Sequence, residues 1–134
     1  MSLLAPLLAV LLAAAPPAVI VREADVARQE VPPHKGVGMS TAYRMSDAAP
    51  GRNFEFRKRV LHPGASIGLH VLSHDEVYYA ISGTGVVTSD GKDSPMEAGT
   101  AAYLYEGADV GIRQTGPEPL VLIIAYPLKE RVKP

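Results

Sequence analysis

The sequence predicts an all-β fold, and three features of the chain carry this prediction. Glycine and proline each occur twelve times among 134 residues, so the chain turns at short intervals. The segments between turns, of about 5 to 7 residues, alternate apolar with polar side chains or are rich in β-branched and aromatic ones. Almost no segment has the period of a helix. A barrel or a double sheet would bury the resulting strands, about nine in number, without leaving their edges open.

Composition excludes several classes of function. The length fits a single domain. The formal net charge is −1, so no field of one sign would attract nucleic acid or an anionic membrane. The chain has no cysteine, which excludes disulfides, thiolate zinc sites and a cysteine nucleophile.

The N-terminal segment 1–21 is an apolar leader. Residues 7–15 have the length of the hydrophobic region of a signal peptide, and three consecutive alanines at 13–15 offer a small-residue cleavage site. No Lys or Arg precedes them, and three prolines interrupt a spanning helix. We therefore expect a signal peptide, export to the periplasm or the medium, and no membrane span in the mature protein. The alternative is a cytoplasmic protein whose uncleaved leader packs on the domain as an arm, with residues 18–22 as a first strand.

Residues 22–39 are expected to form an N-terminal arm and loop. Residues 23–29 have room for one helical turn, and residues 30–38 contain two adjacent prolines and two glycines, which deny them regular structure. His34 lies in this loop, and we expect it to be a solvated surface histidine rather than a ligand.

The strands of a barrel domain are expected over residues 40–127, followed by a frayed, charged tail at 128–134. The Asp90-Gly91 dipeptide predicts a tight hairpin turn, and the LVLII run predicts a final strand buried on both faces. The expected strands include residues 40–45, 54–61, 67–72, 77–82, 86–89, 100–105, 110–115 and 120–126.

The strand at 54–61 alternates aromatic or aliphatic with charged residues. Arg57 and Arg59 share one face with Leu61. These arginines are too few for a nucleic-acid footprint. We expect them to be solvated or ion-paired, in preference to binding an anionic ligand.

Candidate ligands for a metal gather around the polar connector between the strands at 67–72 and 77–82, which we expect to pair as a hairpin. His70 and Glu76 would then lie opposite each other, close enough to touch one ion. An imidazole and a carboxylate suit several divalent transition metals. The alternative is a buried hydrogen-bonded pair that binds nothing.

Residues 62–85, HPGASIGLHVLSHDEVYYAISGTG, resemble the first motif of the cupin superfamily. That motif is a glycine, five residues, His-x-His, three or four residues, a glutamate, six residues and a glycine. Gly64, His70, Glu76 and Gly83 stand at the matching positions, with Leu72 in the place of the second histidine.

Residues 99–114 resemble the second cupin motif, which is a glycine, five residues, Pro-x-Gly, two residues, a histidine, three residues and an asparagine. Gly99 and Gly107 match, and Tyr105 takes the place of the proline. Val110 stands at the histidine position and Gln114 at the asparagine position. The resemblance covers roughly residues 40–126.

The resemblance implies a small single-domain cupin of the conserved-barrel type, with a jelly-roll β-barrel that forms a homodimer. Family members with an intact site hold one divalent metal with three histidines and the glutamate. Leu72 and Val110 replace two of these histidines, so the metal site is degenerate or absent. His74 offers a substitute, which would give a reduced site of His70, His74 and Glu76.

Three functions follow from this pattern. The first is a module that binds a small organic molecule in the barrel without a metal. The second is a metal-dependent isomerase, dioxygenase or cyclase that uses one divalent transition metal on His70, His74 and Glu76. The third is a scaffold for dimerisation with a filled barrel. Tyr78 should face inward, and Tyr79 and Arg113 outward. The expected pocket lining is His70, Leu72, Glu76, Tyr78, Tyr103, Val110 and Gln114.

Overall fold

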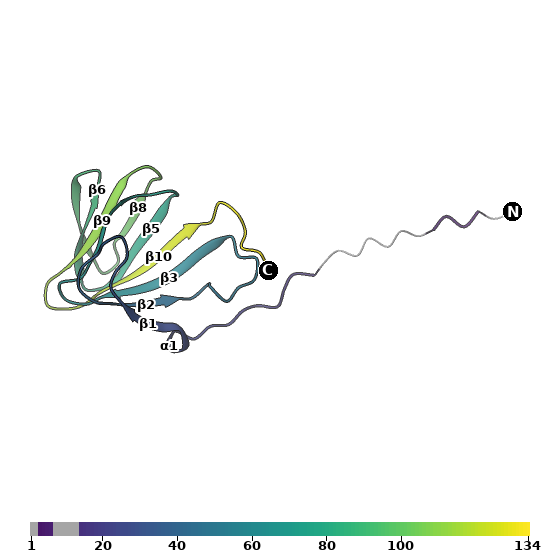
Figure 1. Ribbon diagram of the computed structural model, residues 1–134, viewed down its shortest axis with the longest axis horizontal. Helices are drawn as coiled ribbons and strands as arrows, with labels where there is room; N and C mark the ends of the chain where they lie inside the picture. Colours follow the sequence, from purple (N-terminus) through teal and green to yellow (C-terminus); the bar gives the residue numbers. More distant parts are fainter. Residues whose placement is uncertain (1–2, 7–13) are drawn as a thin grey trace.

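The computed structural model describes residues 3–6 and 14–134 of the chain and shows two antiparallel sheets that face each other as a jelly-roll barrel (Figure 1). One sheet has six strands in the order β1-β2-β3-β10-β5-β8, and the other has four in the order β4-β9-β6-β7. The prediction of an all-β barrel with almost no helix is therefore confirmed.

A single helical turn and ten strands make up the described part of the chain. Their bounds agree with the expected strands to within one or two residues at most ends. The elements are α1 (Glu23–Val26), β1 (Ala27–Glu30), β2 (Ser40–Arg44), β3 (Phe54–Leu61), β4 (Ser66–Val71), β5 (Glu76–Ser82), β6 (Thr84–Ser89), β7 (Lys92–Glu97), β8 (Ala101–Leu104), β9 (Asp109–Thr115) and β10 (Leu120–Pro127).

The hydrophobic core fills the space between the two sheets. It takes inward-facing side chains from both, because alternate residues of a strand point to the same side. Tyr78 is buried and Tyr79 is exposed, as expected from the position of β5. Arg113 is exposed on β9. The largest fully buried side chains are Tyr78, Leu61, Met96, Leu120, Leu122 and Val110.

The expected hairpin between β4 and β5 does not exist. β4 pairs with β9 in the four-stranded sheet, and β5 pairs with β10 and β8 in the six-stranded sheet. The polar connector at residues 72–75 therefore carries the chain from one sheet to the other. His70 and Glu76 face the barrel interior from two different sheets and are not cross-strand neighbours.

The Asp90-Gly91 turn does form a hairpin, between β6 and β7. Asp90 and Gly91 both have positive φ, of 48° and 78°, which a tight two-residue turn between twisted strands requires. Six residue pairs join the two strands, from Thr84 opposite Glu97 to Ser89 opposite Lys92.

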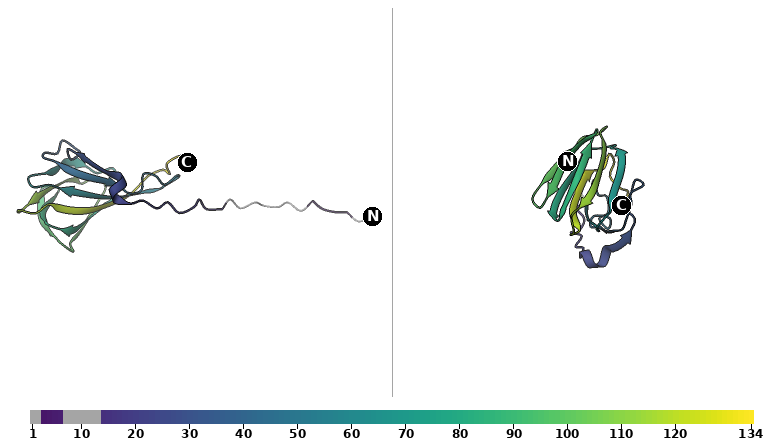
Figure 2. Two further views of the ribbon diagram at one scale, coloured as in Figure 1. Left: turned by 90° about the horizontal axis from the view of Figure 1, so that it is seen from below. Right: turned by 90° about the vertical axis from the view of Figure 1, so that its left-hand side faces the viewer.

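The N-terminal residues add a strand that the sequence analysis missed. β1 lies within the predicted arm and pairs with β2, with Glu30 opposite Ser40. Residues 14–20 form neither helix nor strand, so the alternative of a first strand at 18–22 is wrong. They extend away from the barrel (Figure 2). The hydrophobic region of the expected signal peptide, residues 7–15, lies mostly outside the described residues.

Within the described ranges, none of the helical segments combines the length and the apolar character needed to cross a membrane.

Candidate functional site

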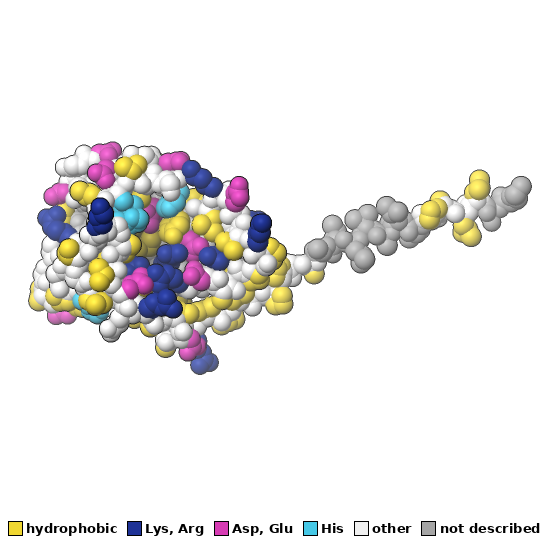
Figure 3. Space-filling model, viewed as in Figure 1, with side chains coloured by type: hydrophobic (Ala, Val, Ile, Leu, Met, Phe, Trp, Pro, Cys, Tyr) yellow, Lys and Arg dark blue, Asp and Glu magenta, His cyan; other side chains and the backbone are white. Residues whose placement is uncertain are grey.

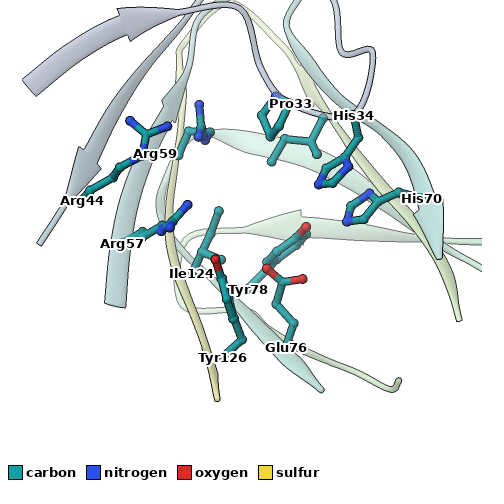
Figure 4. A pocket seen from close by; sticks show the side chains of 11 residues that line it. Pro33, His34, Arg44, Arg57, Arg59, His70, Glu76, Tyr78, Ile124 and Tyr126 are labelled. Atoms are coloured by element: carbon teal, nitrogen blue, oxygen red, sulfur yellow. The ribbon is translucent and has the colours of Figure 1, made fainter. Parts of the chain in front are cut away.

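A cavity of about 140 Å³ opens between the two sheets at one end of the barrel (Figure 4). Arginines enter it from β2 and β3, histidines from the loop before β2 and from β4, and a glutamate and a tyrosine from β5. The residues that line it are Pro33, His34, Arg44, Arg57, Arg59, Ile67, His70, Glu76, Tyr78, Ile124 and Tyr126.

Arg44, Arg57 and Arg59 form an arginine wall of the cavity. Arg57 and Arg59 on β3 are ion-paired, as one of the two expectations had it, but they are not solvated on the outer face. Arg59 is only 5 % exposed, whereas Phe54 and Phe56 are 57 % and 42 % exposed, so the charged face of β3 points into the barrel and the aromatic face points outward. Leu61 shares the charged face and is fully buried in the core. Basic side chains gather on this side of the molecule, with histidines beside them (Figure 3).

Arg44 and Arg59 share one carboxylate. Arg44 Nη2 lies 2.7 Å and Arg59 Nη2 lies 3.1 Å from Oε1 of Glu30, and Arg59 also donates to Ser40 Oγ at 2.9 Å. The hydrogen bond from Arg44, with the charge of both arginines, lowers the pKa of Glu30. Two guanidinium groups thus share one carboxylate, which strand β1 contributes at its last residue.

Arg57 has a weaker partner than its neighbours. The carboxylate of Glu55 accepts hydrogen bonds from Arg52 at 2.8 Å and from Ser46 at 2.9 Å, while Arg57 Nη2 lies 3.6 Å away. The Nε atom of Arg57 is buried and has no hydrogen-bond partner anywhere in residues 3–6 and 14–134. A buried donor without an acceptor costs about 1–3 kcal/mol, so an acceptor from a ligand would relieve a real penalty here.

His34 and His70 stack face to face at the opposite wall, with ring centroids 3.5 Å apart and planes 6° apart. Burial lowers the pKa of His34, and the charges of His70 and Arg59 lower it further. His34 is exposed, as expected for a surface histidine, but its ring also lines the cavity, which the sequence did not predict. Both rings project toward the arginines across the cavity (Figure 4).

A strap at residues 32–37, defined here as the segment that crosses β4, holds His34 in this place. The backbone N–H of Gly68 donates to Pro33 O at 3.3 Å, and Val37 exchanges backbone hydrogen bonds with Ser66 at 3.0 and 3.2 Å. A Cβ on Gly68 would overlap the carbonyl oxygen of His34. His34 itself has a φ of +60°, which is uncommon for a side-chain-bearing residue and typical of functional sites.

Glu76 and Tyr78 form the floor of the cavity from β5. Burial raises the pKa of Glu76 to about 7, against an opposing effect of the Arg57 charge. Burial also raises the pKa of Tyr78, and the neighbouring Glu76 raises it further. At neutral pH the tyrosine is a neutral hydroxyl, and Glu76 is close to half protonated.

His74 belongs to a second, outer cavity of about 140 Å³ that shares His34, His70, Glu76 and Tyr126 with the first. Its ring stacks on Tyr126 at 4.2 Å, and its Nδ1 lies 3.1 Å from Asp75 O. Leu72 also borders this outer cavity and is buried.

The donor set does not fit the metal centre of an intact cupin. Val110 is fully buried in the core and Leu72 is 3 % exposed, so two of the four positions offer no lone pair. No three His, Asp or Glu side chains in the described part of the chain converge on a point where they could hold a metal ion. The structure thus does not assemble His70, His74 and Glu76 into the reduced site suggested by the sequence.

Two further expected lining residues lie elsewhere. Tyr103 is 56 % exposed and donates a hydrogen bond to Asp75 at 2.6 Å. Gln114 is buried but fully engaged, because its side chain accepts from Gly64 N and donates to the carbonyls of Gly116 and Glu118. Gln114 therefore holds turns together and does not line the cavity.

The sequence did not predict the arginine wall. Arg57, Arg59 and His34 are expected outside the site, and Arg44 and Tyr126 are not among the expected lining residues. A signal was available on β3: Leu61 and Arg59 stand two residues apart on one face, and burial of a leucine near the end of the strand implies that the arginine points inward as well.

Comparisons with known proteins agree with this architecture. A family model described as "Cupin domain" matches residues 58–126. Over 62 residues, the chain is 39 % identical to an oxalate-binding protein from Thermotoga maritima. The match covers 46 % of this chain and spans about half, 51 %, of the length of that relative.

Two solved structures extend the comparison to three dimensions. One is named a predicted oxalate decarboxylase from Thermotoga maritima and superposes with a TM-score of 0.73 at 27 % identity, covering 82 % of this chain and 99 % of that one. The other is a Cupin 2 conserved barrel domain protein from Salinispora arenicola, with a TM-score of 0.58 at 27 % identity, covering 65 % of this chain and 74 % of that one.

Proposed function

The chain belongs to the cupin family, and we propose that its barrel binds the anion of a small organic acid on the arginine wall without a metal ion. The buried, unpartnered Nε of Arg57 is the observation that carries this proposal. A carboxylate oxygen is the acceptor that a guanidinium group favours, since it can form two parallel charge-assisted hydrogen bonds.

The charge balance of the pocket favours an anion. Arg44, Arg57 and Arg59 all line the cavity. Glu30 is shared between two of them, and Glu55 is bound more closely by Arg52 than by Arg57. Positive charge therefore exceeds negative charge at this wall, and a bound carboxylate would offset the excess.

The size of the cavity favours a ligand of few atoms. Its volume of about 140 Å³ is less than half the lower end of the roughly 300–1,000 Å³ typical of drug-sized ligands. A two- to four-carbon acid matches this space better than a sugar or a nucleotide does.

The names of the relatives point to the same chemistry. The Thermotoga maritima relative is named an oxalate-binding protein, and the solved structure with a TM-score of 0.73 is named a predicted oxalate decarboxylase. Oxalate is therefore the first acid to test.

Isothermal titration calorimetry of chelator-treated protein with oxalate, acetate and glycolate tests the proposal. We expect at least one acid to bind and Arg57→Gln to weaken it by about 10- to 100-fold, the range for losing a charged hydrogen bond. Arg113→Gln is the matched control, because Arg113 is exposed and lies outside the cavity. The Arg113→Gln variant should bind each acid with the same affinity as the unmodified protein.

Two results would contradict the proposal. One is the absence of binding by every acid, with both variants folded. The other is binding that disappears on chelation and returns with one equivalent of Mn²⁺, Fe²⁺, Ni²⁺ or Zn²⁺, measured by elemental analysis. The second result would favour the metal-dependent enzyme.

A further inference from the structure

The hydrogen bond of His70 fixes which of its nitrogen atoms is free. His70 Nδ1 lies 2.9 Å from the carbonyl oxygen of Gly68. A carbonyl oxygen only accepts hydrogen bonds, so Nδ1 must carry the hydrogen. In the neutral ring the remaining nitrogen, Nε2, is then an acceptor with a free lone pair.

The fold gives this tautomer little freedom. β4 has an irregular register between Ile67 and His70, which leaves the Gly68 carbonyl available to the ring. The strap covers the other side, with His34 stacked on the ring. A flip of the ring about the Cβ–Cγ bond would break the hydrogen bond to Gly68, and any tilt would break the stack on His34, so the side chain is held as a directed acceptor at the wall of the cavity.

The two walls of the cavity therefore differ in hydrogen-bonding character. Arginine side chains are donors only, and Arg44, Arg57 and Arg59 enter from one side. His70 enters from the other side, with Glu76 below it (Figure 4). An ionised Glu76 is also an acceptor, so the second wall accepts hydrogen bonds where the first wall donates them.

We infer that the pocket selects small hydroxy acids, in which a carboxylate binds the arginine wall and a hydroxyl group donates to His70 Nε2. The inference rests on the proposed function and specifies its ligand class. A second carboxylate in the place of the hydroxyl group can only accept hydrogen bonds, and it would face His70 Nε2 and Glu76, which also accept them. Such a ligand would fit only if its carboxyl group or the His70 ring were protonated. A methyl group there would leave the lone pair of His70 without a donor, which is the costly outcome for a polar group inside a pocket.

Glycolate and propionate form a matched pair for the test, because a hydroxyl group in one replaces a methyl group in the other. Their affinities are measured by calorimetry at pH 8, where imidazole side chains are mostly neutral and Glu76 is mostly ionised. We expect glycolate to bind about fivefold more tightly, the ratio that one net hydrogen bond gives. In His70→Phe, which keeps an aromatic ring for the stack, the ratio should fall to about one while propionate still binds.

His62→Phe is the control substitution, since His62 contacts Thr41 and does not line the cavity. It should keep the fivefold ratio, and thermal unfolding confirms that each variant is folded. Equal affinities for glycolate and propionate in the unmodified protein would overturn this inference alone. A preference that persists in folded His70→Phe would overturn the role of His70. Failure of every carboxylate to bind would overturn the proposed function and this inference with it.

Discussion

The carboxyl group of Glu76 lies on the cavity floor at 7 % exposure, and burial raises its pKa to about 7 from an ordinary value of 4.5. Between pH 4.5 and pH 7, Glu76 is therefore mostly protonated in the folded protein and mostly ionised in the unfolded chain. The stability linked to this proton is complete below pH 4.5 and is lost as the pH rises through 7. At 1.36 kcal/mol per unit, the loss amounts to about 3 kcal/mol.

We predict that Glu76→Gln removes this loss. Between pH 5 and pH 8 the free energy of unfolding of the unmodified protein should fall relative to that of the variant, by about 3 kcal/mol in total. Urea unfolding at a series of pH values measures the difference. Glu97→Gln, at an exposed position of β7, is the control and should follow the unmodified protein. A constant difference across the range would show that Glu76 is ionised in the folded protein at all these pH values.

Among the elements, the strap at residues 32–37 owes its position to one residue of β4. Gly68 has no side chain at the point where the His34 carbonyl oxygen crosses the strand. We predict that Gly68→Ala displaces the strap, separates His34 from His70 and lowers the free energy of unfolding by about 1–3 kcal/mol, as overpacking commonly does. Binding of small acids should weaken in the same variant.

Gly111→Ala is the control for this change. Gly111 lies on the neighbouring strand β9, and an added Cβ would come no closer than 3.2 Å to its nearest neighbours, so a small shift can accommodate it. Chemical unfolding and calorimetry compare the two variants. Equal stability and equal affinity in both would show that the strap does not depend on Gly68.

Individual strands were readable from the sequence, but their partners were not. The period of two places β3 at Phe54–Leu61 with the observed bounds, because alternation is a local property. Which strands pair depends on the packing of the whole barrel. Strand β4 pairs with β9, about 45 residues further along the chain, and not with β5. The connector between β4 and β5 looks like a hairpin in sequence, since a chain that turns back and one that crosses to the facing sheet need the same polar residues.

The site was predictable in part for the same reason. His70, Glu76 and Tyr78 follow from spacing, and they do line the cavity. The arginine wall depends on which face of β3 points inward, and hydrophobicity alone suggested the aromatic face. The barrel instead buries Arg59 against Glu30 and Ser40, partners from β1 and β2 that no local pattern reveals.

At the scale of the whole molecule, the outward face of the six-stranded sheet is unusually apolar. Phe56 is 42 %, Tyr79 42 % and Ile81 45 % exposed on β3 and β5. Large exposed apolar groups on one sheet face are typical of an interface. We propose that this face joins two copies of the chain, which is the homodimer that the sequence resemblance implies.

Light scattering coupled to size-exclusion chromatography tests this proposal. We predict a mass of twice 14.2 kDa for the unmodified chain and a single-chain mass for Tyr79→Glu, because a buried unpaired charge at an interface is strongly unfavourable. Leu69→Glu, at a 60 % exposed position of the other sheet, should remain a dimer. A monomeric unmodified chain, or equal masses for both variants, would contradict the proposed interface.

Part of the pocket lies outside the segment that carries the family signature. The matched segment begins at residue 58, whereas Pro33, His34, Arg44 and Arg57 all come before it and still line the cavity. Substitutions in this upstream stretch can change the ligand while the barrel motifs stay the same. Relatives that share the motifs can therefore bind different ligands. Grouping them by the residues that align with this upstream part of the pocket would separate them by ligand chemistry, which family membership alone does not do.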